Sequence, residues 1–489
     1  MTSAEVAISA LEPAVDDLHP PRSLIRRVAA YGLSRGATES LLALRSVLLA
    51  AMLGPAAFGI WALMRLSTRY AFLAAIGVYR GLELELLQGN TEAHRVRKDE
   101  AAATALGFIL LVGGGLSLLA VLAIPLVPEP RYRMVLAGFA AANLFEMVYG
   151  YAMVWTRVRS GLKRFAIMET STAALHVVFA AGLAWVYGLA GAFAGLALAN
   201  LVAIAVAARW VDFRPGLSLE PLRRLFHVGV PVTMTNCVGI LLGTADRWVV
   251  AAWGGPTLLG YYALAASVTS GAVSLSFVIR TVVFRQVYGA AFSVGAAKAL
   301  KSHLERSLLP YARLLPPLLG LVSLAVGPVV VLAMPRYLDA IAPARIFLLI
   351  GAASGLVSLA AIGALAAGRQ RSLPLYAGGA LILTAGLSIL ALVSGAGLEG
   401  VAGAALVGQL FYAAAVLRLV VRETGAPAVN RFVLITLLPL TWCAAAVAIT
   451  GKLVPGNSLR SAALGLVLYL ILILPLASGW RTEFRRLRD

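Results

Sequence analysis

The sequence predicts an all-α polytopic membrane protein with about fourteen transmembrane helices. The chain of 489 residues is 60% hydrophobic and only 13% charged, whereas a typical soluble domain carries about 25% charged residues. Apolar stretches such as residues 105–127 and 461–477 are long enough to cross a hydrocarbon core, which takes about 20 residues. Short segments of alternating hydrophobicity, typical of a membrane β-barrel, are not evident in the sequence.

Apolar runs between turn residues and charged residues define the expected spans. They cover residues 28–53, 57–79, 101–127, 133–156, 165–187, 189–208, 228–252, 257–279, 314–334, 340–367, 373–394, 399–417, 432–451 and 460–479. Lys and Arg concentrate in the two tails and in every second loop, as the positive-inside rule requires when both termini are cytoplasmic. We therefore attribute the formal charge of +19 to topology and contact with anionic lipid, not to binding of nucleic acid.

Two decapeptides indicate an internal duplication. "GPAAFGIWAL" at 54–63 and "GPTLLGYYAL" at 255–264 share Gly, Pro, Gly, Ala and Leu at the same spacing. "PRY" also occurs twice, at 130–132 and 335–337, and "SGLKRF" at 160–165 has a looser counterpart at 367–372. The ordered matches predict two six-helix lobes in the same orientation, an arrangement that places a transport path between the lobes.

The expected organisation has five parts. They are a cytoplasmic tail at 1–27, an N-lobe at 28–208, an amphipathic cytoplasmic linker at 209–227, a C-lobe at 228–421, and a final helix pair with a basic tail at 422–489. The linker combines leucines and phenylalanines with arginines, which is typical of a helix on the membrane surface.

The segments around these turns resemble a known family. "LGPAAFGIWAL" with "AAIGVYRGL", and "VGVPVTM" followed by "TADRWVVAAWGGPTLLGYYALAASV", look like the polysaccharide-export branch of the multidrug/oligosaccharidyl-lipid/polysaccharide exporter superfamily. The resemblance extends over essentially the whole chain. It implies a flippase for lipid-linked oligosaccharides of O-antigen or exopolysaccharide pathways, with the coupling ion left open.

Ionisable residues inside the expected spans are the candidate functional residues, because such residues are expensive in a bilayer and usually face a wet cavity or a partner. The candidates for binding substrate in a cavity are Arg45, Arg65, Arg69, Arg80 and Arg247. The candidates for charge pairing or ion coupling are Arg35, Glu39, Glu146 and Asp246. Counting from the expected turns places Arg45, Arg65 and Arg247 roughly 12–15 Å deep, near the midplane.

Two interpretations of these charges stay open at this point. In the structural one, Arg35 pairs with Glu39, and either Arg45 or Arg65 pairs with Glu146. In the functional one, the surplus arginines bind an anionic headgroup, because guanidinium forks suit phosphate oxygens. Arg65 and Arg69 share a helix face, and Arg80 is expected on the same stripe.

A proline in the seventh span is a candidate hinge. Pro231 removes a backbone donor and is expected to kink its helix. We expect no cofactor and no metal site, because the histidines and the two cysteines show no ligand spacing. No phosphate-binding loop or H-E-x-x-H motif is present, and the short extracytoplasmic loops argue against a membrane glycosyltransferase or polymerase. We therefore do not expect an enzyme.

The expected substrate is an isoprenoid diphosphate-linked oligosaccharide, moved across the cytoplasmic (inner) membrane by alternating access. Membrane lipids are expected partners, as are the polysaccharide polymerase and glycosyltransferases of the same pathway, while nucleic acid is not. Two alternatives from the same superfamily remain: a flippase for a peptidoglycan lipid precursor and, less favoured, a multidrug cation antiporter. The antiporter is expected to have acidic cavity residues without surplus arginine.

Overall fold

The computed structural model describes residues 22–75, 77–87, 92–269, 296–425, 428–454, 456 and 458–476. Within these ranges all regular structure is helical, so the predicted all-α class is confirmed. Most of the expected N-terminal tail, the end of the expected span at 257–279 and the basic C-terminal tail lie outside the described residues. The chain divides into two compact units, 1–237 and 238–489.

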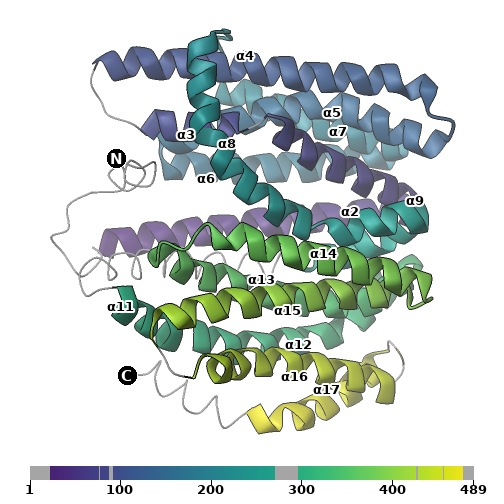
Figure 1. The fold of residues 1–489 in the computed structure, drawn as a ribbon. Coiled ribbons are helices and arrows are strands. Elements are labelled where there is room, and N and C mark those ends of the chain that lie inside the picture. The colour runs from purple at the N-terminus through teal and green to yellow at the C-terminus, as the bar shows by residue number, and fades with distance from the viewer. Residues whose placement is uncertain are drawn as a thin grey trace. The chain divides into compact units, whose positions relative to one another are not determined.

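The first unit is built from helices α2 to α7 and most of α8. Their bounds are α2 Arg22–Ala74, α3 Val78–Leu87, α4 Glu92–Ala123 with η1 Ile124–Leu126, α5 Pro130–Trp155 with η2 Thr156–Ser160, α6 Leu162–Leu175, η3 His176–Ala181, α7 Gly182–Ala207 and α8 Leu219–Leu242. Helices α4 and α5 lie side by side (Figure 1). The segment η3 is a single π-helical turn between α6 and α7, an irregularity that is frequent at functional sites.

The second unit contains helices α9 to α17. Their bounds are α9 Ala245–Ser267, α11 Ala296–His303, η4 Leu304–Leu308, α12 Leu309–Ala333, η5 Pro335–Ala340, α13 Ile341–Ala366, α14 Ser372–Val393, α15 Gly397–Glu423, α16 Val429–Leu453, α17 Leu459–Ile473 and η6 Leu474–Leu476. Helix α15 packs against both α13 and α14, and the pair α14–α15 is visible in Figure 1. The core of this unit includes Leu356, Val420 and Cys443, all nearly inaccessible.

Helix α2 is a hairpin that turns at Gly54. The Arg45 guanidinium carbon lies 5.7 Å from the centre of the Trp61 ring, although an unbroken helix would separate residues so spaced by about 24 Å. Gly54 has φ 73° and ψ 172°, a backbone region almost restricted to glycine. Pro55 follows it, and a proline is well tolerated in the first turn of the new helical arm.

The second decapeptide forms the same turn. Gly255 has φ 69° and ψ −176° and precedes Pro256. The Tyr262 hydroxyl donates a hydrogen bond of 2.8 Å to Asp246 across this turn, so α9 also folds back on itself. The sequence repeat therefore produces the same glycine–proline turn once in each unit.

A third hairpin turns at Gly188. The Nε2 atom of His176 lies 3.1 Å from Oδ1 of Asn200, a contact that a straight helix would not permit. Gly191 and Gly195 allow the two arms to touch, because an added Cβ would come within 2.0 Å and 2.3 Å of opposing carbonyl oxygens.

The hairpins reconcile the span count with the prediction. Eleven described stretches are long and apolar enough to cross a membrane, and three of them fold back at Gly54, Gly188 and Gly255. With each hairpin counted as two arms, the described part of the chain contains fourteen apolar arms. The predicted polytopic all-helical class is thus confirmed, with eleven candidate spans and fourteen helical arms in the described part of the chain.

Helix α8 begins inside the expected linker and continues beyond it. It runs from Leu219 through Pro231 to Leu242 and changes direction along its length (Figure 1). Its first part is fastened to α3, because Leu225 is buried and a Cβ on Gly229 would come within 2.0 Å of the Gly77 carbonyl oxygen. The division between the two compact units falls within α8, six residues after Pro231.

Candidate functional site

The first unit carries an ion pair between α2 and α5. Arg65 Nη1 lies 2.8 Å from Oε1 and 2.6 Å from Oε2 of Glu146. The two side chains keep 27% and 15% of their surface exposed. Of the two pairings open from the sequence, the structure forms the one that uses Arg65. Both carboxylate oxygens are occupied by one guanidinium nitrogen, so this arginine is largely neutralised.

A second cluster joins α2 to α6. Arg35 pairs with Glu39 one turn later, at 2.6 Å, and also with Glu169 on α6. The predicted Arg35–Glu39 pair is therefore confirmed, and Glu169 adds a second carboxylate to the same guanidinium. The Ser34 hydroxyl lies 2.9 Å from the Thr170 hydroxyl, which extends the polar contact between these helices. This cluster carries more negative than positive charge and fastens α2 to α6.

Arg45 has a different environment, because it lies against a neutral partner. Its Nη1 is 3.4 Å from Nδ1 of His176. A guanidinium can only donate, so His176 accepts at Nδ1 and carries its hydrogen on Nε2, which then donates to Oδ1 of Asn200 at 3.1 Å. This assignment follows from the hydrogen-bond network. Arg65 and Glu146 lie within electrostatic reach of Arg45, yet among the described residues no carboxylate forms an ion pair with Arg45.

The Arg45 side chain is also buried against an aromatic ring. It is 7% exposed and lies over Trp61, whose ring stacks on Phe193 with centroids 5.9 Å apart. Its Nε and the side-chain nitrogen of Asn200 are buried without a hydrogen-bond partner. Unpaired buried donors are costly, so this group of donors is suited to an acceptor such as a phosphate oxygen or an ordered water molecule.

Arg69 and Arg80 do not form the continuous stripe that the sequence predicted. Helix α2 ends at Ala74, and Gly77 with φ 86° breaks the helix before α3 begins at Val78. The helical register is lost across this break, so the helical spacing that predicted the alignment of Arg80 with Arg69 does not apply. Arg69 is exposed on α2, and Arg80 pairs with Glu83 at 2.7 Å.

Two acidic residues on α3 organise the surrounding arginines, and sequence reasoning missed both. Glu83 contacts Arg157 at 3.2 Å as well as Arg80. Glu85, whose side chain is only 5% exposed, binds Arg97 at 2.7 Å. The signal was present in the sequence as "ELEL" at 83–86 among basic loops. Both residues lie between the expected spans 57–79 and 101–127, outside the segments in which ionisable residues were candidates.

In the second unit, Asp246 and Arg247 begin α9. Asp246 is 4% exposed; one carboxylate oxygen accepts from the backbone nitrogen of Arg247 at 2.9 Å and the other from the Tyr262 hydroxyl. Asp246 therefore fixes the hairpin and is occupied on both oxygens. The Arg247 side chain has a buried Nε without a hydrogen-bond partner, and no described carboxylate forms an ion pair with it.

Nine of the ten predicted site residues separate into three groups, and the tenth, Arg69, is exposed on α2. Arg35, Arg65 and Arg80 are paired with carboxylates, and Glu39 and Glu146 are their partners. Arg45 and Arg247 have no carboxylate ion pair in the described ranges and carry buried unpaired Nε atoms. Asp246 and Pro231 contribute to the architecture of α9 and α8. No cluster of three or more His, Cys, Asp or Glu that could hold a metal occurs within the described residues.

Comparison with known proteins gives a family match and structural matches. Residues 48–336 match the family described as polysaccharide biosynthesis protein. A comparison with curated protein sequences gives no match.

Among solved structures, the fold is similar to that of lipid II flippase MurJ in an inward closed conformation, with a TM-score of 0.71 at 13% identity over 94% of this chain and 100% of that one. It is also similar to a multidrug resistance MATE family transporter of the MOP superfamily. The outward-facing structure of that transporter type gives a TM-score of 0.56 at 14% identity, covering 89% of this chain and 98% of the other. The inward-facing structure gives 0.54 at 14% identity, covering 92% and 99%.

Proposed function

The chain belongs to the polysaccharide biosynthesis protein family, and from this premise we propose that it is a flippase for an isoprenoid diphosphate-linked oligosaccharide. The family match and the transporter fold support a transport role in building a cell-surface polysaccharide. The cytoplasmic (inner) membrane is the proposed location, because lipid-linked sugars are assembled on its inner face. The polymerase and glycosyltransferases of the same pathway are the proposed partners.

The observation that carries the proposal is the environment of Arg45. A buried guanidinium in a membrane-spanning hairpin normally has a carboxylate partner. Here it is held by His176 in a neutral tautomer, so the positive charge is positioned but not cancelled. A diphosphate that reached this site would meet an oriented cation in a medium of low dielectric constant, where charge-assisted hydrogen bonds are strong.

Arg247 is the corresponding candidate in the second unit. Each lies in the arm before the turn glycine of its decapeptide, with nine residues from Arg45 to Gly54 and eight from Arg247 to Gly255. Each has a buried Nε without a partner. In each unit the duplicated hairpin therefore carries an arginine that forms no carboxylate ion pair among the described residues. We propose that these two arginines, more than Arg65, Arg69 or Arg80, contact the diphosphate.

The experiment is a complementation assay in cells that lack the gene, with surface polysaccharide as the readout and membrane protein level as the control. Arg45→Gln and Arg247→Gln are expected to reduce export at least tenfold at normal protein level. Arg133→Gln, which alters an exposed arginine bonded to the Val127 carbonyl, is the matched control and is expected to export normally. Normal export by both Arg45→Gln and Arg247→Gln would contradict the proposal.

The two alternative functions, a peptidoglycan-precursor flippase and a cation antiporter, differ from the proposed one in the substrate that is transported. A peptidoglycan-precursor flippase would use the same diphosphate contacts, and its fold similarity to this chain is the strongest structural match described above. Loss of such a protein stops growth, whereas loss of a polysaccharide exporter removes surface polysaccharide. A cation antiporter requires acidic cavity groups, and uptake of a cationic dye into vesicles would reveal that activity.

A further inference from the structure

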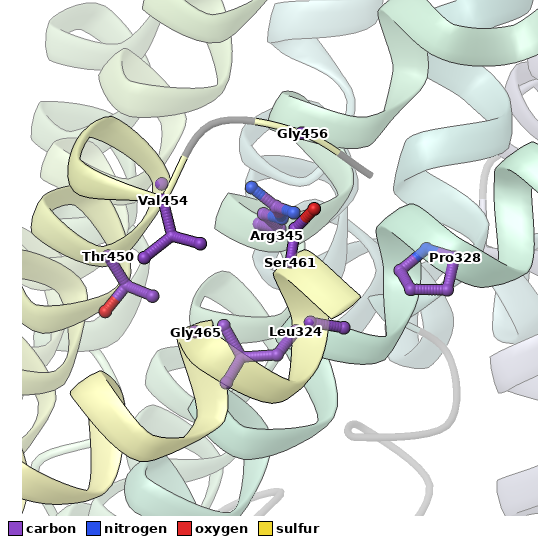
Figure 2. Close-up of a pocket in the computed structure, with 10 residues that line it drawn as sticks. Leu324, Pro328, Arg345, Thr450, Val454, Gly456, Ser461 and Gly465 are labelled. Atoms are coloured by element: carbon purple, nitrogen blue, oxygen red, sulfur yellow. The ribbon is translucent and has the colours of Figure 1, made fainter. Parts of the chain in front are cut away.

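A small cavity in the second unit lies apart from all residues discussed so far. It is formed between α12, α13, α16 and α17, and its volume is about 10 Å³. Its lining residues include Leu324, Pro328, Arg345, Gly451 and Ser461 (Figure 2). A cavity needs roughly 10–15 Å³ to hold one water-sized particle, so there is room for one small occupant.

Arg345 is the only charged residue of this lining. Its Nε is buried, and the guanidinium has no hydrogen bond or ion pair within the described ranges. Glu399 lies within electrostatic reach, but it is exposed and is not in contact distance. Figure 2 shows the guanidinium next to the Ser461 side chain, near the backbone of Gly456.

The start of α17 adds a second positive end to the same place. Ser458 caps this 15-residue helix by accepting a hydrogen bond of 3.1 Å from the nitrogen of Ser461. Other N–H groups of a first helical turn have no partner within the helix, and this end carries partial positive charge. A guanidinium and a helix N-terminus are both positive, so they repel each other when they lie side by side. An anion bound between them removes this repulsion.

We propose that this cavity binds a small monovalent inorganic anion such as chloride. The Arg345 guanidinium and the uncapped N–H groups at the start of α17 supply the donors, while the Ser461 hydroxyl lies 2.7 Å from the Ser458 hydroxyl. The anion links α13 to α17 and so fastens the C-terminal helix pair α16–α17 to the rest of the second unit. The proposal is independent of the transported substrate.

The test measures thermal unfolding of the purified full-length protein in detergent, in sodium chloride, bromide or gluconate at constant ionic strength. Chloride and bromide are expected to raise the unfolding midpoint by several degrees in a saturable manner, and gluconate is not. Arg345→Gln is expected to abolish the halide dependence. Arg336→Gln, which alters an exposed arginine near the start of the same helix, is expected to retain it.

A second variant keeps the charge and removes the space. A Cβ on Gly451 would lie 3.5 Å from Nη1 of Arg345, so the larger side chain in Gly451→Val fills the cavity. This variant is expected to raise the halide concentration that gives half of the stabilisation at least tenfold. This variant carries the test if Arg345→Gln does not fold. Equal midpoints in chloride and gluconate for the unmodified protein, or an undiminished halide effect in the variants, would overturn the proposal and leave water as the occupant.

Discussion

Arg65 and Glu146 meet across two helices with both carboxylate oxygens within 2.8 Å of one guanidinium nitrogen. Arg45, 20 residues earlier in the same hairpin, instead contacts the neutral imidazole of His176 and the Trp61 ring. Of these two arginines, Arg65 is paired with a carboxylate and Arg45 is not. This difference separates a structural arginine from a candidate binding residue.

The ion pair is expected to behave as a structural unit. Arg65→Gln and Glu146→Gln should each lower the free energy of unfolding, because each leaves one charge unpaired in the membrane. The loss should be smaller than the about 3–5 kcal/mol typical of fully buried pairs, since Arg65 keeps 27% exposure. The double variant should recover much of the loss. Thermal unfolding of all four proteins measures this coupling.

Export by the double variant decides what Arg65 does. A purely structural pair predicts near-normal export once both charges are removed together, and this is the result we expect. Lost export with recovered stability would instead assign Arg65 to substrate binding.

The neutral partner of Arg45 can be exchanged for a charged one. His176→Glu would place a carboxylate beside Arg45 and cancel its charge. We expect export to fall at least tenfold while the protein level stays normal or rises. His176→Gln retains a neutral acceptor and should preserve most export. Equal export by the two variants would show that the charge of Arg45 does not matter.

Because the two arms of the Gly188 hairpin pack closely, adding a methyl group at a contact glycine is expected to lower stability. Gly195→Ala would bring a Cβ within 2.3 Å of the Phe179 carbonyl oxygen, and overpacking of this kind costs about 1–3 kcal/mol. Gly182→Ala, at a helical position with open space, is the control and should be neutral or slightly stabilising. Thermal unfolding compares them, and an equal response would argue against this packing account.

We propose that Pro231 is a hinge in α8. The residues before it are fastened to α3, whereas the division between the compact units follows six residues later. Pro231→Ala would restore a backbone donor and stiffen the helix. Export should slow several-fold while the unfolding midpoint stays the same or rises. Spin labels on either side of Pro231 would report the bending directly, and unchanged export and bending would remove the hinge.

The Gly-Pro pairs of the two decapeptides allowed the turns at Gly54 and Gly255 to be predicted from the sequence. Gly54 and Gly255 adopt a backbone conformation that other residues avoid, so the same local chemistry produced the same turn twice. The polar network was harder to anticipate. Glu83 and Glu85 lie on a helix only ten residues long. Arg80 is three residues before Glu83 on that helix, but Arg157 and Arg97 come from other elements, so no spacing rule connects these two arginines to their carboxylates.

The sequence by itself determined the class of protein, the number of apolar arms and the positions of the hairpin turns, because hydrophobicity, glycine conformation and loop charge are local properties. Only the tertiary structure decided which arginines are neutralised. Glu146 reached Arg65 and His176 reached Arg45 through the packing of distant helices, and electrostatic pairing depends on distances in space that the order of residues along the chain does not contain.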